Sequence, residues 1–237
     1  MTDRVIALGF FDGVHLGHGA LLRETAGIAA REKLEPAALT FLGHVAGKPA
    51  RQLTTPEERE RSIRELYGLK TVFLTFDEQL RGTMPADFVC LLRDRFCAAH
   101  LVAGYDFTFG RGGSGNAATL QDCCKRLGLG CTLIDVVLLD GLPVSTSRIR
   151  EMLSLGRMKK AVELMGHPYA LTLEFSRTEG TCLCHRIPEE TLLPAAGRYL
   201  GRTERGTVCA DVRGSELFLS GPGAADGPVR LLLESEV

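Results

Sequence analysis

The amino-acid sequence predicts an α/β protein in which a doubly wound parallel sheet is followed by a small antiparallel β domain. Up to about residue 140, apolar runs of strand length alternate with segments of helical periodicity, which indicates repeated βαβ units. Beyond about residue 169, short alternating strands are broken by Gly and Pro, which is typical of a reduced antiparallel barrel. The expected domains are residues 1–168 and 169–237, with a hinge at Gly166-His167-Pro168.

Five apolar runs are expected to form the parallel sheet: residues 5–9, 37–41, 71–76, 100–104 and 131–139. The segment "TTPEERERSIRELYG" illustrates the helices between them, because Thr55 can cap a helix and Pro56 suits its first position. Two short helices, "TSRIREMLSLG" and "RMKKAVELMG", precede the change of pattern. The second domain is expected to contain strands in "YALTLEFSR", "GTCLCHR", "GTVCADVRG", "SELFLSG" and "GPVRLLLESEV".

The composition is that of a globular protein, with 45% hydrophobic and 24% charged residues and a formal net charge of -1. This charge predicts no general attraction to nucleic acid or to membrane surfaces. No run approaches the roughly 20 apolar residues of a membrane span, and no secretory signal is recognisable, so a cytoplasmic location is expected. The eight cysteines contain no CxxC pair and are expected to be reduced structural thiols.

The segment "GFFDGVHLGH", residues 9–18, follows the first expected strand and contains an HxGH element formed by His15 and His18. A glycine turn that leads into a helix presents backbone amides to an anion, and two imidazoles add hydrogen-bond donors. Phosphate transfer needs such positioning and charge neutralisation. The alternative is that these histidines cap the helix or pack in the core.

A second polar element, "VSTSRIRE", precedes a later helix. Three hydroxyl residues stand before the helix, and Arg148 and Arg150 lie in its first turn. The hydroxyls could simply cap the helix. The two arginines, however, oppose the helix dipole, which predicts a compensating anion such as a triphosphate.

The segment "GYDFTFGRGGSGN", residues 104–116, offers two phenylalanine faces and several glycines after the fourth expected strand. Its GxGxxG spacing, with Asp135 twenty residues beyond, also fits a dinucleotide-binding fingerprint. That alternative is disfavoured because the glycines come late in the domain and Asp135 is expected inside a strand. Both phenylalanines could instead be core residues.

Together, the HxGH element and "VSTSRIRE" resemble the HxGH nucleotidylyltransferase superfamily, which has a Rossmann-like fold and a second ISSTxxR signature. With "GYDFTFGRGGSGN" and "LMGHPYAL", the segments from about residue 4 to 170 resemble the FAD synthetase module of bacterial bifunctional riboflavin kinase/FMN adenylyltransferases. This resemblance implies transfer of AMP from ATP to FMN, which forms FAD and pyrophosphate.

The resemblance also implies the site residues. His15, His18 and Arg150 would be catalytic. ATP would bind at Gly9, Phe10, Phe11, Asp12, Gly13, His15, His18, Ser145, Thr146, Ser147 and Arg150. The flavin would bind at Asp106, Phe107, Phe109 and Asn116. Mg²⁺ is expected as the charge partner of ATP, with few protein ligands.

Two departures from the family pattern bear on activity. In place of an FDPHP-type element stands "FLGHVAGK", residues 41–48, which keeps Phe41 and His44 but lacks the acid and both prolines. The C-terminal domain lacks a PTAN element and the kinase glycine turn, so no riboflavin kinase activity is expected, and its role would be structural support or a dimer contact. The alternatives are a paralogue that binds flavin or nucleotide without turnover, and a nucleotidylyltransferase with another phosphorylated acceptor.

Overall fold

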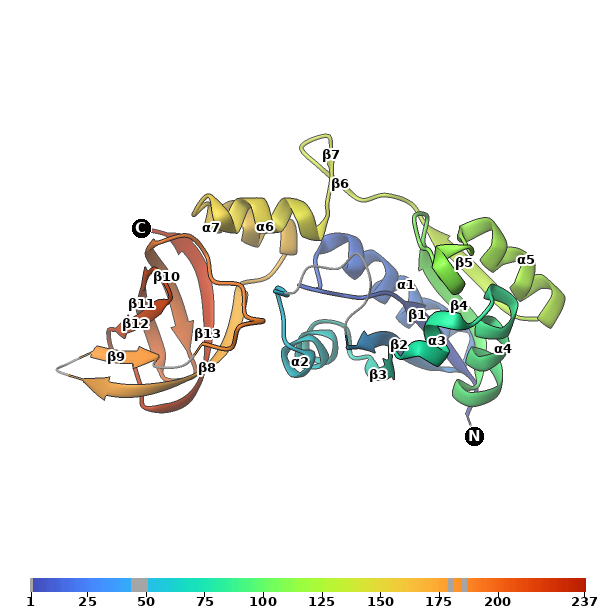
Figure 1. Ribbon diagram of the computed structural model, residues 1–237, viewed down its shortest axis with the longest axis horizontal. Helices are drawn as coiled ribbons and strands as arrows, with labels where there is room; N and C mark the ends of the chain where they lie inside the picture. Colours follow the sequence, from blue (N-terminus) through green and yellow to red (C-terminus); the bar gives the residue numbers. More distant parts are fainter. Residues whose placement is uncertain (1, 44–50, 179–180, 185–186) are drawn as a thin grey trace. The chain divides into compact units, whose positions relative to one another are not determined.

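A computed structural model describes residues 2–43, 51–178, 181–184 and 187–237 (Figure 1). The chain divides into two compact units. Unit 1 contains Met1–Lys48 and Glu60–Leu138, and unit 2 contains Pro49–Arg59 and Leu139–Val237. The first division between the units falls within the helix Pro56–Tyr67. Residues 139–168, which were expected in the first domain, belong to unit 2. The domain boundary expected after residue 168 stays a prediction.

Unit 1 is built on a five-stranded sheet with the order β3-β2-β1-β4-β5, in which every neighbouring pair is parallel. This confirms the doubly wound fold class. The strands are β1 (Arg4–Leu8), β2 (Glu35–Leu42), β3 (Lys70–Thr75), β4 (Ala98–Gly104) and β5 (Gly130–Ile134). The helices are α1 (Leu16–Glu32), α2 (Pro56–Tyr67), α3 (Glu78–Gly82), α4 (Pro85–Phe96), the 3₁₀ turn η1 (Arg111–Gly113) and α5 (Ala117–Leu127).

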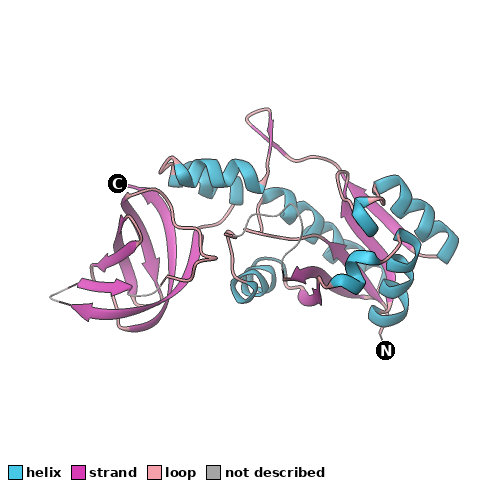
Figure 2. Cartoon of the chain, viewed as in Figure 1, coloured by secondary structure: helices cyan, strands magenta, loops and turns pink. Residues whose placement is uncertain are grey.

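Alternate residues of β1 enter two different cores, because successive side chains of a strand point to opposite faces of the sheet. Val5 and Ala7 pack in a cluster with side chains of α1 and with Ile63 of α2. Ile6 and Leu8 pack in a second cluster with side chains of α4 and α5. Helices therefore cover both faces of the sheet (Figure 2).

The strand expected over residues 131–139 is wrong in its second half. β5 ends at Ile134, and a separate hairpin follows, with β6 (Leu138–Leu139) and β7 (Leu142–Pro143). Its turn is Asp140-Gly141, and both residues have positive φ, 55° and 74°. Paired left-handed residues make the turn that suits a two-residue hairpin. Asp135 consequently lies after β5, exposed, rather than inside a strand.

Unit 2 contains a closed six-stranded barrel with the order β10-β11-β12-β9-β8-β13, preceded by α6 (Thr146–Ser154) and α7 (Met158–Met165). The strands are β8 (Tyr169–Thr178), β9 (Thr181–Cys184), β10 (Gly197–Thr203), β11 (Gly206–Arg213), β12 (Glu216–Ser220) and β13 (Gly227–Glu236). The barrel confirms the antiparallel β domain. β10, "GRYLGRT", was not expected as a strand, because its two glycines and two arginines obscure the alternation.

Side chains in β8 alternate between the barrel core and the outer surface. Leu171, Leu173 and Phe175 are buried, whereas Thr172 and Glu174 are exposed. Burying each such aliphatic or aromatic side chain stabilises the folded state by about 1.5–3 kcal/mol. The barrel is therefore a packed core of its own.

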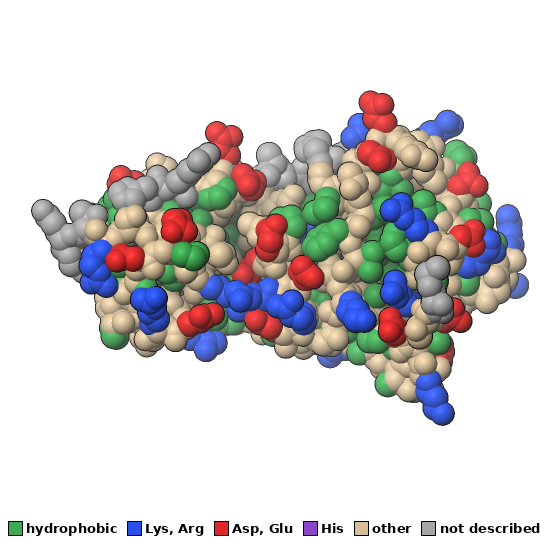
Figure 3. Space-filling model, turned by 90° about the horizontal axis from the view of Figure 1, so that it is seen from below, with side chains coloured by type: hydrophobic (Ala, Val, Ile, Leu, Met, Phe, Trp, Pro, Cys, Tyr) green, Lys and Arg blue, Asp and Glu red, His purple; other side chains and the backbone are tan. Residues whose placement is uncertain are grey.

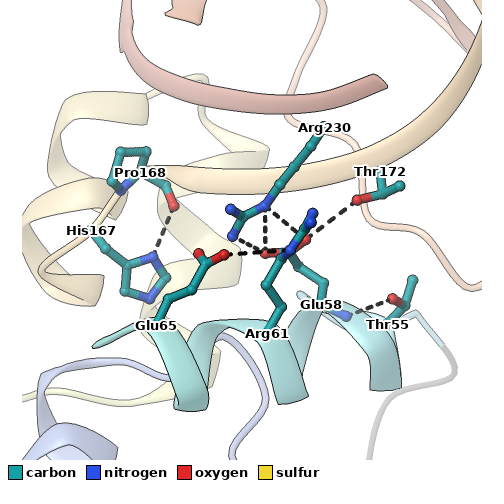
Figure 4. A network of polar contacts seen from close by, with 8 residues as sticks. All are labelled: Thr55, Glu58, Arg61, Glu65, His167, Pro168, Thr172 and Arg230. Carbon is teal, nitrogen blue, oxygen red and sulfur yellow. Dashed lines mark hydrogen bonds and ion pairs between the residues drawn. The ribbon is translucent and has the colours of Figure 1, made fainter. Parts of the chain in front are cut away.

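The start of α2 is tied to the outside of this barrel within unit 2. Thr55 Oγ1 accepts a hydrogen bond from the Glu58 amide at 3.2 Å, which confirms the predicted helix cap. The Glu58 carboxylate, 3% exposed, accepts hydrogen bonds from the Arg230 guanidinium of β13 at 2.5–3.1 Å and from the Thr172 hydroxyl at 3.3 Å (Figure 4). A buried carboxylate needs such partners, and loss of one would be costly.

Across the described part of the chain, none of the helices combines the length and the hydrophobicity that a membrane crossing demands.

Candidate active site

Two of the predicted motifs leave neighbouring strands at the same edge of the sheet in unit 1. The HxGH segment follows β1, and "GYDFTFGRGGSGN" follows β4. β1 and β4 are adjacent, and the order of strands reverses between them. Open α/β sheets bind ligands outside the carboxyl ends of their strands at such a switch point. The topology thus brings these two motifs to one candidate site.

The turn after β1 is tight and buried. Phe11, Gly13 and Val14 all have positive φ, at 51°, 76° and 40°, and the Val14 amide donates to the Phe11 carbonyl at 3.1 Å. Left-handed φ costs a non-glycine residue roughly 1–2 kcal/mol. Complete burial of the Phe11 and Val14 side chains offsets that strain. A Cβ on Gly9 would lie 2.9 Å from the Phe11 ring, so glycine is required there for close packing.

Phe10 and Asp12, which are also expected to contact ATP, lie in the same turn and are held in place. The Phe10 carbonyl accepts a hydrogen bond from the Thr40 hydroxyl of β2 at 2.8 Å. Asp12 is buried, with 3% of its surface exposed, at the start of the turn. The backbone between β1 and α1 is therefore a fixed structure rather than a flexible linker.

His15 is the N-cap of α1, and its Nδ1 accepts a hydrogen bond from the His18 amide at 3.3 Å. Because Nδ1 is the acceptor, the neutral His15 ring carries its proton on Nε2. The His15 and His18 rings are stacked, with centroids 3.6 Å apart, and the Phe11 ring meets His18 edge-on at 5.3 Å. The capping role is thus real, and it also orients both imidazoles at the positive end of the α1 dipole.

The segment after β4 combines a core residue with an open glycine loop. Phe109 is buried against Phe88, whereas Phe107 is half-buried and stacks on Phe109 with ring centroids 5.5 Å apart. Phe109 and Gly115 exchange two backbone hydrogen bonds, which close the loop between them. For Phe109 the core interpretation therefore holds, and Phe107 is the ring with a partly exposed face.

Asp106 and Asn116 are both exposed. Asn116 is the N-cap of α5, since its Oδ1 accepts hydrogen bonds from the Thr119 amide at 3.0 Å and from the Thr119 hydroxyl at 3.1 Å. A cap explains this asparagine without any ligand. A flavin contact by Asp106 or Asn116 stays a prediction.

The position of Asp135 removes one reason that was given against a dinucleotide fingerprint, because this residue does follow the end of β5. The other reason, that the glycines come late in the domain, stands because they follow β4, the fourth of the five sheet strands, and the structure adds a further one. In the fingerprint the glycine turn joins strand and helix directly, whereas here residues 105–109 separate β4 from the glycines and Asn116 opens α5.

Phe41, which is kept from the family pattern and lies near the end of β2, has an aromatic partner in Phe76 after β3, a residue that the sequence does not single out. The Phe41 ring meets Phe76 edge-on at 6.1 Å, the Arg81 guanidinium lies 5.6 Å from the Phe76 ring centre, and both rings pack on the cluster that contains Phe109. The sequence does show an aromatic residue at the end of each of these two strands, and that pattern could have indicated the pair. Residues 44–48 of "FLGHVAGK" lie outside the described residues.

The second phosphate motif belongs to unit 2. Ser145 is the N-cap of α6, with its hydroxyl accepting from the Arg148 amide at 3.3 Å. Arg148 donates to the carbonyls of Leu139 and Leu142, at 3.1 and 3.3 Å, so these dipoles compensate its charge in place of the anion that was expected. Thr146 and Arg150 are half-buried and Ser147 is exposed. Cooperation of this motif with His15 and His18 stays a prediction.

Among the described residues, no group of three or more His, Cys, Asp or Glu side chains is arranged to hold a metal ion. All eight cysteines are present as thiols, either buried or half-buried. A hydrogen bond with Cys131, and then burial, raise the pKa of Cys124, so its thiol is neutral in the core.

Comparison with known proteins identifies the family. The model of the family described as FAD synthetase matches residues 1–148, more than half of the chain. A protein named FAD synthetase from Listeria monocytogenes is 30% identical over 211 residues, covering 86% of this chain and 82% of the relative. A bifunctional riboflavin kinase/FMN adenylyltransferase from Bacillus subtilis is 34% identical over 171 residues, covering 70% of this chain but 54% of the relative.

A solved structure has the same fold. The crystal structure titled macrolide-efflux protein from Streptococcus pneumoniae matches with a TM-score of 0.86 and 23% identity, covering 100% of this chain and 86% of the other. At that identity the likeness concerns the fold alone. The family match and the relative of similar length carry the identification: the chain belongs to the FAD synthetase family.

Proposed function

We propose that this protein transfers AMP from ATP to FMN, which yields FAD and pyrophosphate, and that it does not phosphorylate riboflavin. The observation that carries the first part is the HxGH turn at the switch point of the sheet, in a chain of the FAD synthetase family. Two oriented imidazoles at a helix N-terminus are suited to an anionic transition state.

The reaction needs little acid–base chemistry. An FMN phosphate oxygen is already anionic, so it can attack the ATP α-phosphorus while the bond to the pyrophosphate oxygen breaks. Catalysis then consists of alignment and charge neutralisation. His15, with its proton on Nε2, would donate to a phosphate oxygen, and His18 would stabilise the charge that develops as pyrophosphate leaves. Gly9 and Gly13 would let the nucleotide approach the backbone of the turn.

The segment before α6 would hold the β and γ phosphates. Ser145, Thr146 and Ser147 supply hydroxyls at the α6 N-terminus, and the half-buried Arg150 supplies a cation one turn into the helix. Arg148 is engaged by backbone carbonyls and is left out of this set.

The isoalloxazine ring would lie against the partly exposed aromatic faces at the ends of β2, β3 and β4. Phe107 is the candidate from the β4 segment, and Phe41 and Phe76 extend the aromatic surface. Aromatic rings stack on flat ligands with gains of about 0.5–1.5 kcal/mol beyond area burial. Phe109 would support Phe107 from the core.

Mg²⁺ would bind together with ATP, because phosphate oxygens and water are its preferred ligands. The described residues contain no preformed cluster for it, and the buried Asp12 is the carboxylate in the turn after β1. Bound Mg²⁺ would neutralise charge on the triphosphate. The substrates of the proposed reaction are small molecules. On the face shown in Figure 3, acidic and basic side chains are interspersed rather than gathered in the single basic patch that a nucleic-acid surface would need.

The absence of kinase activity is proposed from the barrel. The buried side chains of its strands include Tyr169 and Tyr199, each 1% exposed. Their hydroxyls donate to the carbonyls of Leu192 and Ala195, at 2.5 and 2.6 Å, in the segment that precedes β10. Together with the missing PTAN element, this packing supports a structural role for the barrel.

The test is to incubate the protein with Mg-ATP and either FMN or riboflavin and to separate the flavins by chromatography. FAD should form from FMN, with release of pyrophosphate, and no FMN should form from riboflavin. Tight flavin binding without FAD would favour the non-catalytic paralogue. AMP transfer to another phosphorylated acceptor would favour the third hypothesis, and FMN formed from riboflavin would contradict the kinase part.

A further inference from the structure

Within unit 2, α7 packs against the barrel strands β13 and β8, and one cross-strand pair of the barrel lies at the turn between α6 and α7. Tyr199 of β10 and Glu236 of β13 are direct partners in the antiparallel ladder. Directly opposite residues point to the same face of a sheet. Both side chains reach the turn between α6 and α7, at opposite ends of it.

Tyr199 acts at the end of α6. Its hydroxyl donates to the Ala195 carbonyl at 2.6 Å, and the Ala195 amide in turn donates to the Leu153 carbonyl of α6 at 2.8 Å. The same hydroxyl oxygen would lie 3.3 Å from a Cβ on Gly156, the second residue after the helix. Burial, and then the charge of Glu236, raise the pKa of Tyr199, so its hydroxyl remains a donor at neutral pH.

Glu236 acts at the start of α7. Its Oε2 accepts a hydrogen bond from the Lys159 amide at 2.8 Å, in the first turn of that helix. This bond lowers the pKa of Glu236, which is therefore charged at neutral pH. A carboxylate at a helix N-terminus also complements the dipole.

Packing makes α6 and α7 one body. Leu153 of α6 and Met158, Ala161 and Leu164 of α7 are completely buried. A pair of helices held at its turn can rotate little, so the N-terminal end of α6 keeps a defined direction relative to the barrel. The phosphate motif lies at that N-terminal end.

We propose that Tyr199 and Glu236 are positioning residues that orient α6 for ATP, so that the barrel contributes to adenylyl transfer without a reaction of its own. The inference rests on the proposed function only in taking Ser145 to Arg150 as the triphosphate site. If the barrel only stabilised the fold, variants of Tyr199 and Glu236 would not change the affinity for ATP; under this proposal they do.

The test measures the Kd of Mg-ATP by calorimetry, in addition to the KM values for ATP and FMN and kcat. Tyr199→Phe and Glu236→Ala should each raise the Kd and the KM of ATP about three- to tenfold, the factor expected for one lost hydrogen bond. The KM of FMN should stay within about twofold, since the helix does not contribute to the flavin surface. Glu236→Gln should restore most ATP affinity, because its amide oxygen can still accept from the Lys159 amide.

Tyr169→Phe is the matched control. Tyr169 is as buried as Tyr199, and its hydroxyl bonds to the Leu192 carbonyl in the same segment, three residues before Ala195. This variant should lower the melting temperature with little change in ATP affinity. The control for Glu236 is Glu234→Ala, also on β13, which removes an exposed ion pair with Arg202 of β10.

Three outcomes would overturn the inference. Tyr199→Phe and Glu236→Ala could lower the melting temperature and leave the Kd of Mg-ATP unchanged, or Tyr169→Phe could weaken ATP binding equally, or the unaltered protein could fail to bind Mg-ATP. Failure of the proposed function is separate: the unaltered protein would bind Mg-ATP but form no FAD, and the Kd values of the variants would still decide the role of the barrel.

Discussion

The turn after β1 and the segment after β4 leave adjacent strands at the same edge of one sheet, yet they are built in opposite ways. In the first, Phe11, Asp12, Val14 and His15 are all buried. In the second, Arg111 to Ser114 are exposed, and Gly110, Gly112 and Gly113 have positive φ. One is a packed turn that fixes two imidazoles, and the other is an open glycine loop anchored at Phe109 and Gly115.

This difference matches the two tasks that the proposed reaction sets. Transition-state stabilisation requires groups whose positions are fixed before the substrate arrives. Recognition of a large planar acceptor tolerates a loop that adjusts around a rigid aromatic base. We therefore expect variants of the first turn to reduce turnover, and variants of the second segment to alter stability or FMN affinity.

The largest expected effect is the loss of stability in Phe109→Ala. Removal of this core ring should lower the free energy of unfolding by about 3–5 kcal/mol, whereas removal of the half-buried Phe107 should cost roughly 1–2 kcal/mol. Chemical denaturation would measure both. Phe107→Ala should also raise the KM of FMN, and this rise should be larger than its small loss of stability would explain. An unchanged KM of FMN in Phe107→Ala would remove that ring from the flavin surface.

The next effect is on turnover. His18→Ala should lower kcat by about 10²-fold or more, the magnitude typical of losing one preorganised transition-state contact. The same loss is expected in Arg150→Ala. Steady-state FAD formation would measure both, with the melting temperature as a check on folding. If both variants kept the kcat of the unaltered protein, the assignment of these residues would be wrong even though FAD is made.

Substitution of glycine by alanine compares the packing of the two segments. In Gly9→Ala the new methyl would meet the Phe11 ring at 2.9 Å, and we expect a loss of about 1–3 kcal/mol in stability together with reduced kcat. Gly112 has open space around it and a φ of 63°, so Gly112→Ala should cost only about 1 kcal/mol of strain and keep its kcat. Equal losses of kcat would contradict the contrast between the segments.

The smallest effect concerns Asn116. Asn116→Ala should lower stability by about 1 kcal/mol because α5 loses its cap, and Asn116→Ser should restore most of it. If Asn116 also contacts the flavin, the KM of FMN should stay high in Asn116→Ser. A KM of FMN that returns to its original value with the cap would assign this residue to helix capping alone.

Sequence patterns predicted the elements around the site better than their arrangement. Val5 to Leu8 and the helix from Leu16 were recognisable because apolar runs and helical periodicity are local properties. The neighbouring positions of β1 and β4 depend on which faces the helices cover, which no local pattern specifies. The proximity of the two motifs in unit 1 therefore had to come from the structure.

The errors had physical signals of their own. "LLDGLP" contains an Asp-Gly pair between apolar residues, which is a strong hairpin signal, but the apolar run before it masked the end of β5. The capping of α1 by His15 does not exclude its predicted phosphate contact, because the cap uses Nδ1 and leaves Nε2 for another partner. Pairing of Tyr199 with Glu236 spans 37 residues and depends on barrel register, so no sequence motif could reveal it.

Closure of the barrel in unit 2 limits how that unit can associate with other molecules. The five-stranded sheet ends in the edge strands β3 and β5, whereas in the closed barrel each strand is paired on both sides. A protein with unpaired edges can recruit a further strand through backbone hydrogen bonds, and a closed barrel cannot. Any partner of this barrel must therefore recognise its side chains and connecting loops, and its specificity would be read from the outward residues of the strands.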